Sequence, residues 1–148
     1  MDTTPLLVDD PDLAAKIMLA DRVVLAGDDP ASEVYVGSKA KMCARLGMRS
    51  ETHRLPATVS QAELEALVEQ LNHDPEVDGI LVQLPLPDGI DSGRIIERID
   101  PAKDVDGFHR DNVGGLSQGR PVLTPCTPAG CMRLLRDRLG DLAGKHAV

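Results

Sequence analysis

The stretch EVYVGSKAKM, residues 33–42, places the only tyrosine of the chain, Tyr35, four residues before Lys39. On a helix, residues four apart lie on one face, so the phenol ring and the ammonium group would be neighbours. An aromatic face binds flat, electron-poor rings, and a lysine beside it could move protons. The same spacing also suits a tyrosine at the core edge with a lysine stem along it. This stretch alone leaves both interpretations open.

Gln83 is the second unusual residue, because it interrupts the apolar run ILVQLPLP. A buried parallel strand is usually apolar throughout, and a buried amide without partners costs about 1–3 kcal/mol. One explanation is a ligand beyond the carboxyl end of the strand, where open α/β sheets bind their ligands. The other is an amide satisfied by the backbone of a neighbouring loop.

Asp104 and Asp106 in KDVDGF lie two residues apart, so in an extended chain both carboxylates would project to one side. A calcium loop needs further oxygen ligands and an acidic residue at its twelfth position, where this chain has Gly115. We therefore discount calcium. A carboxylate that binds substrate and a turn-forming Asp-Gly remain as alternatives.

The cysteines and histidines give weaker signals. Cys43, Cys126 and Cys131 form no CxxC pair and are expected to be reduced thiols packed as small apolar residues. Cys126 has no histidine next to it in sequence, which disfavours a nucleophile, and the four histidines lack metal-ligand spacing. No metal site is expected.

Strands and helices that alternate must position these residues, as in a parallel sheet covered by helices. Capping signals mark two helices: Asp29 with Pro30 for the first, and the Ser60–Glu63 capping box for the second. The expected elements are a strand at 22–27, a helix from Pro30 to Gly47, a strand at 50–55, a helix from Ser60, a strand at 79–87, a short helix at about 91–99, an irregular stretch at 103–125, and a helix from Thr127, as its cap, to Gly140.

Composition limits the classes of protein. The 148 residues suit one domain, and a net charge of −8 without a basic cluster disfavours a nucleic-acid partner. The first residues lack the features of a signal peptide, and no stretch is apolar for long enough to span a membrane. We expect a cytoplasmic protein.

Four motifs together carry a resemblance to a known family. GDDPASEVYVGSK, DGILVQLPLPDGID, PAKDVDGFHRDNVG and TPCTPAGCMRLL occur in the order found in bifunctional methylenetetrahydrofolate dehydrogenase/methenyltetrahydrofolate cyclohydrolases. The resemblance covers residues 21–148. It implies an α/β catalytic domain of three layers, helices on both faces of a mainly parallel sheet, which acts on tetrahydrofolate derivatives.

The resemblance also implies roles for individual residues. Tyr35 would stack on the folate ring system, Lys39 would be the central catalytic residue, and Gln83 would hold and tune it. Asp106 would hydrogen-bond the pterin. The catalytic set is thus Tyr35, Lys39, Gln83 and Asp106, and the remaining substrate-binding residues, which would shape the wall of the site, are Leu84 and Pro85.

Both ends of the chain depart from the family pattern. The segment before the first strand matches poorly and looks shortened, and LAGKHAV resembles the start of the NADP-binding Rossmann domain. We therefore expect a catalytic domain at 1–140, a stub of that second domain at 141–148, and no NADP-binding residues in this chain. Because family dimers associate largely through the second domain, weaker or absent self-association is expected.

Three functions remain in competition. The first is an enzyme domain that oxidises methylenetetrahydrofolate with NADP and hydrolyses the methenyl product to 10-formyltetrahydrofolate, with at best the cyclohydrolase step open to this chain alone. The second is a folate-binding fragment without catalysis. The third, a receiver-like regulatory domain, is disfavoured because the strand at 22–27 ends in Gly27 rather than in an acidic cluster.

Overall fold

A computed structural model describes residues 20–146. The segment expected to be shortened, residues 1–19, and the last two residues of the expected stub, 147–148, lie outside this described part. In the described chain the elements follow one another in the alternating order that the sequence predicts as far as the third strand.

Three parallel strands form the sheet, in the order β2-β1-β3. Strand β1 (Ala20–Ala26) lies in the middle, between β2 (Arg49–Leu55) and β3 (Gly79–Val82). In register, Val23 of β1 pairs with Thr52 of β2 and with Leu81 of β3. The predicted α/β class with a parallel sheet is confirmed.

Local capping chemistry starts the two long helices where the sequence predicts. Helix α2 (Pro30–Arg45) begins after Asp29, whose carboxylate accepts from the Ser32 amide at 2.7 Å. Helix α3 (Gln61–His73) begins with the full Ser60–Glu63 capping box. These caps satisfy amides that the first turn of a helix leaves unpaired, so both starting points are local properties of the sequence.

Two elements are shorter than predicted. Strand β3 ends at Val82, although the apolar run continues to residue 87. The Gln83 amide still donates to Val24 O at 2.9 Å, but Pro85 and Pro87 have no N–H to donate to the strand ladder. The helix predicted at about 91–99 is α4 (Ser92–Ile96), which begins after the Asp91 cap.

The prediction of an irregular stretch over residues 103–125 is wrong, because helix α5 (Arg110–Ser117) lies within it. The His109 ring caps this helix by accepting from the Asp111 amide at 3.1 Å. Glycine lowers helix propensity, but Gly115 is required by packing, since a Cβ there would lie 2.5 Å from Val122 Cγ1. Tertiary packing therefore outweighs the local glycine signal.

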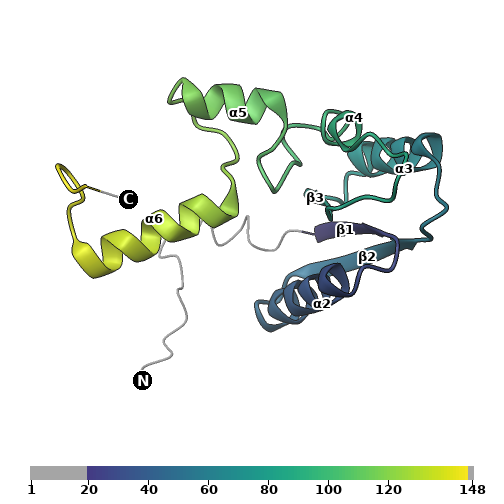
Figure 1. Cartoon of the computed structure of the whole chain (residues 1–148), viewed down its shortest axis with the longest axis horizontal. Coiled ribbons are helices and arrows are strands. Elements are labelled where there is room, and N and C mark those ends of the chain that lie inside the picture. The colour runs from purple at the N-terminus through teal and green to yellow at the C-terminus, as the bar shows by residue number, and fades with distance from the viewer. Residues whose placement is uncertain (1–19, 147–148) are drawn as a thin grey trace.

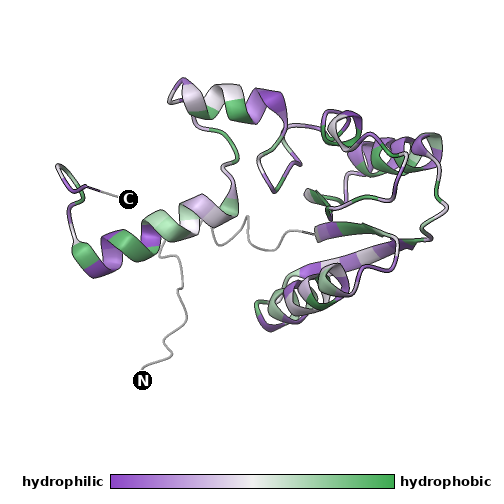
Figure 2. Ribbon diagram, in the orientation of Figure 1, coloured by the Kyte–Doolittle hydropathy of each residue, from purple (hydrophilic) through white to green (hydrophobic). Residues whose placement is uncertain are grey.

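Helix α6 (Cys126–Leu139) differs from prediction at its start. Pro125 occupies the cap position and no side chain caps the helix, so the predicted Thr127 cap is wrong. None of its residues is buried, and its leucines and methionine are exposed along its length. Figure 1 shows α6 apart from the sheet, and Figure 2 shows the hydrophobic residues along it.

Helices cover both faces of the sheet (Figure 1). Alternate residues of β1 face opposite sides: Val24 and Ala26 join the large cluster under α3 and α4, and Val23 and Leu25 join a small one under α2. The large cluster contains eleven buried residues and the small one four. Most of the apolar core therefore lies on the side of α3 and α4.

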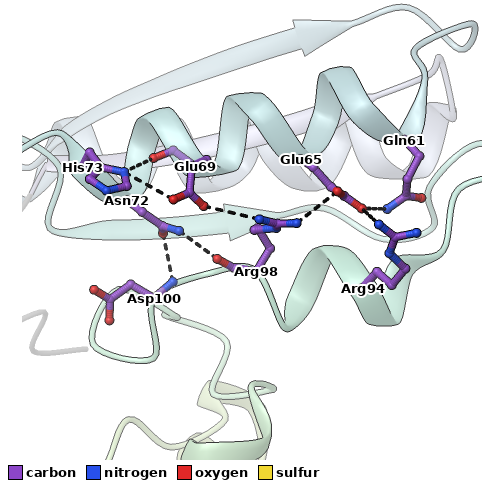
Figure 3. Close-up of polar contacts among 8 residues, drawn as sticks. All are labelled: Gln61, Glu65, Glu69, Asn72, His73, Arg94, Arg98 and Asp100. Carbon is purple, nitrogen blue, oxygen red and sulfur yellow. Dashed lines mark hydrogen bonds and ion pairs between the residues drawn. The ribbon is translucent and has the colours of Figure 1, made fainter.

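Charged side chains join α3 to α4 at the surface (Figure 3). Glu65 of α3 contacts Arg94 at 2.7 Å and Arg98 at 3.2 Å, and Arg98 also reaches Glu69 at 3.8 Å. Arg94 belongs to α4 and Arg98 follows its end, so these contacts link α3 to α4 and to the residues after it. In the described part of the chain, no helix is long and apolar enough to cross a membrane.

Candidate functional site

All six residues predicted for the site line one cavity of about 480 Å³. Tyr35 and Lys39 come from α2, Gln83, Leu84 and Pro85 follow β3, and Asp106 comes from the loop before α5. The cavity therefore lies beyond the carboxyl ends of β1 and β3, the edge at which ligands bind in open α/β sheets. A hollow of about 820 Å³ beside α5 is larger, but it holds none of these residues.

The tyrosine and the lysine meet as the helical spacing predicts. Lys39 Nζ lies 4.8 Å from the centroid of the Tyr35 ring, within the range of a cation–π contact. The tyrosine is 51% exposed, so much of its side chain is accessible at the cavity. An aromatic face and an ammonium group are thus presented together at the cavity.

Gln83 lies just past β3, with its backbone amide still bonded to the sheet. Its side-chain Nε2 donates to Leu84 O at 2.6 Å, so loop backbone does satisfy part of this amide. The side chain also lines the cavity with Lys39. The loop-backbone explanation is therefore confirmed in part, and the ligand explanation stays a prediction.

The two aspartates of KDVDGF have different environments. Asp104 is 2% exposed and accepts from the backbone amides of Gly107 at 3.1 Å and His109 at 2.8 Å. The Asn112 side chain donates to it at 3.0 Å. Asp106 instead lines the cavity. Asp104 is therefore the turn-forming carboxylate, and Asp106 is the one available to a ligand.

The loop that carries Asp106 is anchored on the end of α3. Lys103 Nζ donates to the carbonyls of Leu71, Asn72 and Asp74 at 3.2, 2.7 and 2.8 Å. A positive charge beside the carbonyls at the C-terminal end of a helix is favoured by the helix dipole. Sequence reasoning missed this contact, because a lysine 29 or more residues after its partners leaves no local signal.

Asp21 is a further acidic residue near Lys39 that sequence reasoning missed. A second cavity of about 230 Å³ adjoins the first, is lined by apolar side chains for the most part, and contains Asp21 with Lys39 and Asp106. The signal was available, since Asp21 is an acidic residue within a strand of the core. Sequence alone could not show that it lies near the lysine.

Burial shifts the acid–base behaviour of both free carboxyls. Burial raises the pKa of Asp21 above its ordinary value, and the Lys39 ammonium group offsets part of this rise. The pKa of Asp106 is raised by the same cause and offset by the same lysine. Asp21 Oδ1 is enclosed without a hydrogen-bond partner among the described residues. The Ser50 hydroxyl approaches this carboxyl from β2, but without hydrogen-bonding geometry.

Cys126 lines the smaller cavity, and its thiol lies 3.6 Å from Val105 O. No histidine of the described chain lines either cavity, so this thiol has no imidazole partner there. The described residues contain no group of three or more acidic, histidine or cysteine side chains that could hold a metal ion. The chemistry available is therefore proton movement by Lys39 and binding by the ring, the amide and Asp106.

Known proteins resemble this chain in sequence and in structure. Bifunctional protein FolD 2 of Ectopseudomonas mendocina is 62% identical over 135 residues, covering 91% of this chain and 45% of that protein. Bifunctional protein FolD of Cereibacter sphaeroides is 59% identical over 126 residues, covering 85% of this chain and 43% of that protein. The chain therefore spans less than half the length of these relatives.

Solved structures show the same fold. The bifunctional FolD methylenetetrahydrofolate dehydrogenase/cyclohydrolase of Campylobacter jejuni superposes with a TM-score of 0.79 at 45% identity, over 85% of this chain and 51% of that chain. The Trypanosoma brucei enzyme, crystallised with NADP and an inhibitor, gives a TM-score of 0.81 at 31% identity, over 95% of this chain and 54% of that one.

Residues 12–106 match the family described as tetrahydrofolate dehydrogenase/cyclohydrolase, catalytic domain. This match covers well over half of the chain and includes every residue predicted for the site. The chain belongs to the tetrahydrofolate dehydrogenase/cyclohydrolase catalytic-domain family.

Proposed function

We propose that this chain is the folate-binding catalytic domain of a methylenetetrahydrofolate dehydrogenase/methenyltetrahydrofolate cyclohydrolase. The observation that carries the proposal is the grouping of Lys39 over the Tyr35 ring, at 4.8 Å, in one cavity with Gln83 and Asp106. Three separate segments of the chain supply these residues, and the chain belongs to the family that acts on tetrahydrofolates.

The hydrolytic reaction requires proton movement. Water attacks the cationic amidinium carbon of 5,10-methenyltetrahydrofolate, and protons must move as the ring opens to 10-formyltetrahydrofolate. Lys39 is the group at the cavity that can carry such a proton. Tyr35 presents a face for the flat ring system, and Asp106 an acceptor for the N–H groups of the pterin.

Gln83 would restrain the lysine from the other side of the cavity, because its own amide is fixed by the bond to Leu84 O. Leu84 and Pro85 complete the wall beside it. In this assignment, Lys39 acts on the substrate directly and Gln83 positions it. The two acidic groups, Asp21 and Asp106, add negative charge that favours a cationic substrate.

The dehydrogenase step needs NADP, which accepts a hydride when it is bound. The turn between β1 and α2 does not fit its phosphate groups. The turn between β1 and α2 is the place for a phosphate, but Asp28 and Asp29 follow Gly27 there. The Asp29 carboxylate already occupies the start of the helix and would repel a phosphate. We therefore derive no step through NADP and propose the cyclohydrolase half-reaction as the one to measure.

The test is the decay of methenyltetrahydrofolate absorbance with purified chain, compared with Lys39→Met. We expect a rate above buffer for the unchanged chain and a fall to the buffer rate for the variant. Lys41→Met is a matched control, because Lys41 is exposed on the same helix and lines neither cavity. Equal rates for all three proteins at the buffer background would reject catalysis by this chain.

A second candidate is a folate-binding domain without turnover. The exposed face of Tyr35 supports it, because ring binding requires no proton transfer. It predicts that a folate analogue binds and that Tyr35→Ala weakens this binding, with no decay of methenyltetrahydrofolate above buffer. Calorimetric titration with folic acid separates the two candidates. We also propose a cytoplasmic location, which three free cysteines in an acidic chain support.

A further inference from the structure

The two aromatic rings of the chain line the same cavity. The sequence contains one tyrosine, one phenylalanine and no tryptophan. Tyr35 and Phe108 both line the 480 Å³ cavity, and they are 51% and 48% exposed. Phenylalanine is usually buried, and the core of this chain is aliphatic. The position of Phe108 at the cavity therefore requires an explanation.

The backbone on either side of Phe108 is held by a single buried carboxylate. Asp104 accepts from the amide before the ring, Gly107 N, at 3.1 Å and from the amide after it, His109 N, at 2.8 Å. Asn112 of α5 completes this arrangement by donating to Asp104 at 3.0 Å and to Pro101 O at 2.9 Å. Phe108 is thus presented by a hydrogen-bonded frame, not by a loose loop.

Gly107 brings the same loop into close contact with the segment that precedes α6. A Cβ on this residue would lie 2.9 Å from both Leu123 O and Pro125 N, and its φ of +67° is in the region that favours glycine. The loop therefore lies tightly against the segment that leads into α6. Because both neighbours of Phe108 are fixed, the direction in which its ring leaves the backbone is restricted.

We propose that Phe108 is a second aromatic wall of the site, which contacts the ring system of a bound folate together with Tyr35. This inference rests on the proposed function, since it concerns how the same cavity binds the same class of ligand. Because the backbone that carries the ring is fixed before binding, less conformational freedom is lost when the ligand arrives. Phe108 is a binding residue in this proposal and takes no part in proton transfer.

The size of the effect follows from the contact. A ring contact between aromatic groups adds about 0.5–1.5 kcal/mol beyond the apolar area that it buries. Since 1.4 kcal/mol corresponds to a factor of about ten in affinity, Phe108→Ala should weaken folate binding by about tenfold. Phe108→Leu retains apolar area without the aromatic face, and we expect a loss of about threefold. Phe108→Tyr should bind within about twofold of the unchanged chain.

The experiment is calorimetric titration of each purified variant with folic acid, after a thermal melt has shown that it folds. Leu116→Ala is the matched control, because Leu116 is 46% exposed on the neighbouring α5 and does not line the cavity. We expect the control to bind as the unchanged chain does. Unchanged affinity in a folded Phe108→Ala variant would overturn the inference, and so would a Phe108→Leu variant that binds as tightly as the unchanged chain.

The Tyr35→Ala variant separates this inference from the proposed function. If Tyr35→Ala weakens binding and Phe108→Ala does not, the proposed folate site is supported and the proposed role of Phe108 is rejected. If the unchanged chain does not bind folic acid at all, both proposals are rejected. If both variants weaken binding and Leu116→Ala does not, the inference is supported.

Discussion

The two faces of the sheet differ in how much they bury and in what they carry. Under α3 and α4 lies a cluster of eleven buried residues, with ion pairs at the surface between α3 and the segment of α4 and the residues after it. Under α2 lies a cluster of four buried residues. The same helix carries Tyr35 and Lys39 of the candidate site. One face holds most of the core, and the other holds the polar residues of the site.

This difference shows how the fold accommodates charged groups at the centre of its sheet. Ionisable groups are costly beside a large apolar core, because burial disfavours their charged form. On the side of α2, two cavities leave room around Lys39, Asp21 and Asp106. The incomplete packing of this face is therefore part of what makes the site possible.

Matched valines on the two faces provide the strongest test of the comparison. Val68 of α3 is 0% exposed and Val36 of α2 is 1% exposed, but Val68 belongs to the large cluster and Val36 to the small one. We expect Val68→Ala to lower the free energy of unfolding by about 2 kcal/mol and Val36→Ala by about 1 kcal/mol, because a sparse cluster collapses more easily around the change.

Urea titration of both variants measures these losses. Leu134→Ala is the control, since Leu134 of α6 is 65% exposed and should change stability little. A larger loss for Val36→Ala than for Val68→Ala would show that the face of α2 is the better packed one, and the comparison would fail.

Asp21→Asn tests the cost of the charged group on the side of α2. Burial raises the pKa of Asp21, so the folded chain binds its proton more tightly than the unfolded chain. The stability from this group is fully present below its ordinary pKa of 3.8 and is lost as pH rises through the raised value. At pH 7 we therefore expect Asp21→Asn to increase stability by about 1 kcal/mol, because the neutral amide has no charge whose burial must be offset.

The gain should disappear as the pH falls towards 3.8, which urea titrations at several pH values can follow. Asp29 provides a comparison of opposite sign, because hydrogen bonds from Ser32 lower the pKa of its carboxyl. Its contribution is present above its ordinary pKa and is lost as pH falls through the lowered value. A gain from Asp21→Asn that is equal at all pH values would contradict this account.

The smallest effect is expected from the ion pairs that cover the large cluster (Figure 3). Arg98 contacts Glu65 and Glu69, but its side chain is 44% exposed and solvent screens both contacts. We expect Arg98→Ala to lower the melting temperature by about 2 °C or less. Raised salt should reduce the difference between the two proteins further. A fall as large as that of Val68→Ala would show that these pairs, not the core, hold this face.

Much of the fold could be predicted because its signals are local. The caps at Asp29 and Ser60, and the strand at 22–27, depend on residues within a few positions of each other. Helix α5 could not be predicted in this way, because its two glycines disfavour a helix, and the close approach of Gly115 to Val122, beyond the end of the helix, is visible only in the folded chain. The sequence reasoning took Pro85 as the residue that ends β3, but the strand already ends at Val82.

The residues of the candidate site likewise differ in whether local sequence signals could predict them. The Tyr35 and Lys39 contact follows from helical spacing, and the order of the four motifs brought Gln83 and Asp106 into the predicted set. Sequence reasoning could not separate the roles of Asp104 and Asp106, which have the same chemistry two residues apart. Only the burial of Asp104 and its bonds to the amides of Gly107 and His109, which the folded loop brings together, distinguish them.

By itself, the sequence determined where most elements begin, which side chains share a helix face, and to which family the chain is similar. Only the tertiary structure decided that Lys103 donates to carbonyls at the end of α3. It also decided that Asp21 lies near Lys39, and that Phe108 lines the same cavity as Tyr35. The physical reason is the distance along the chain over which each interaction acts. Caps and helical spacing act between residues a few positions apart, while burial and charge depend on segments that meet only when the sheet and its loops have assembled.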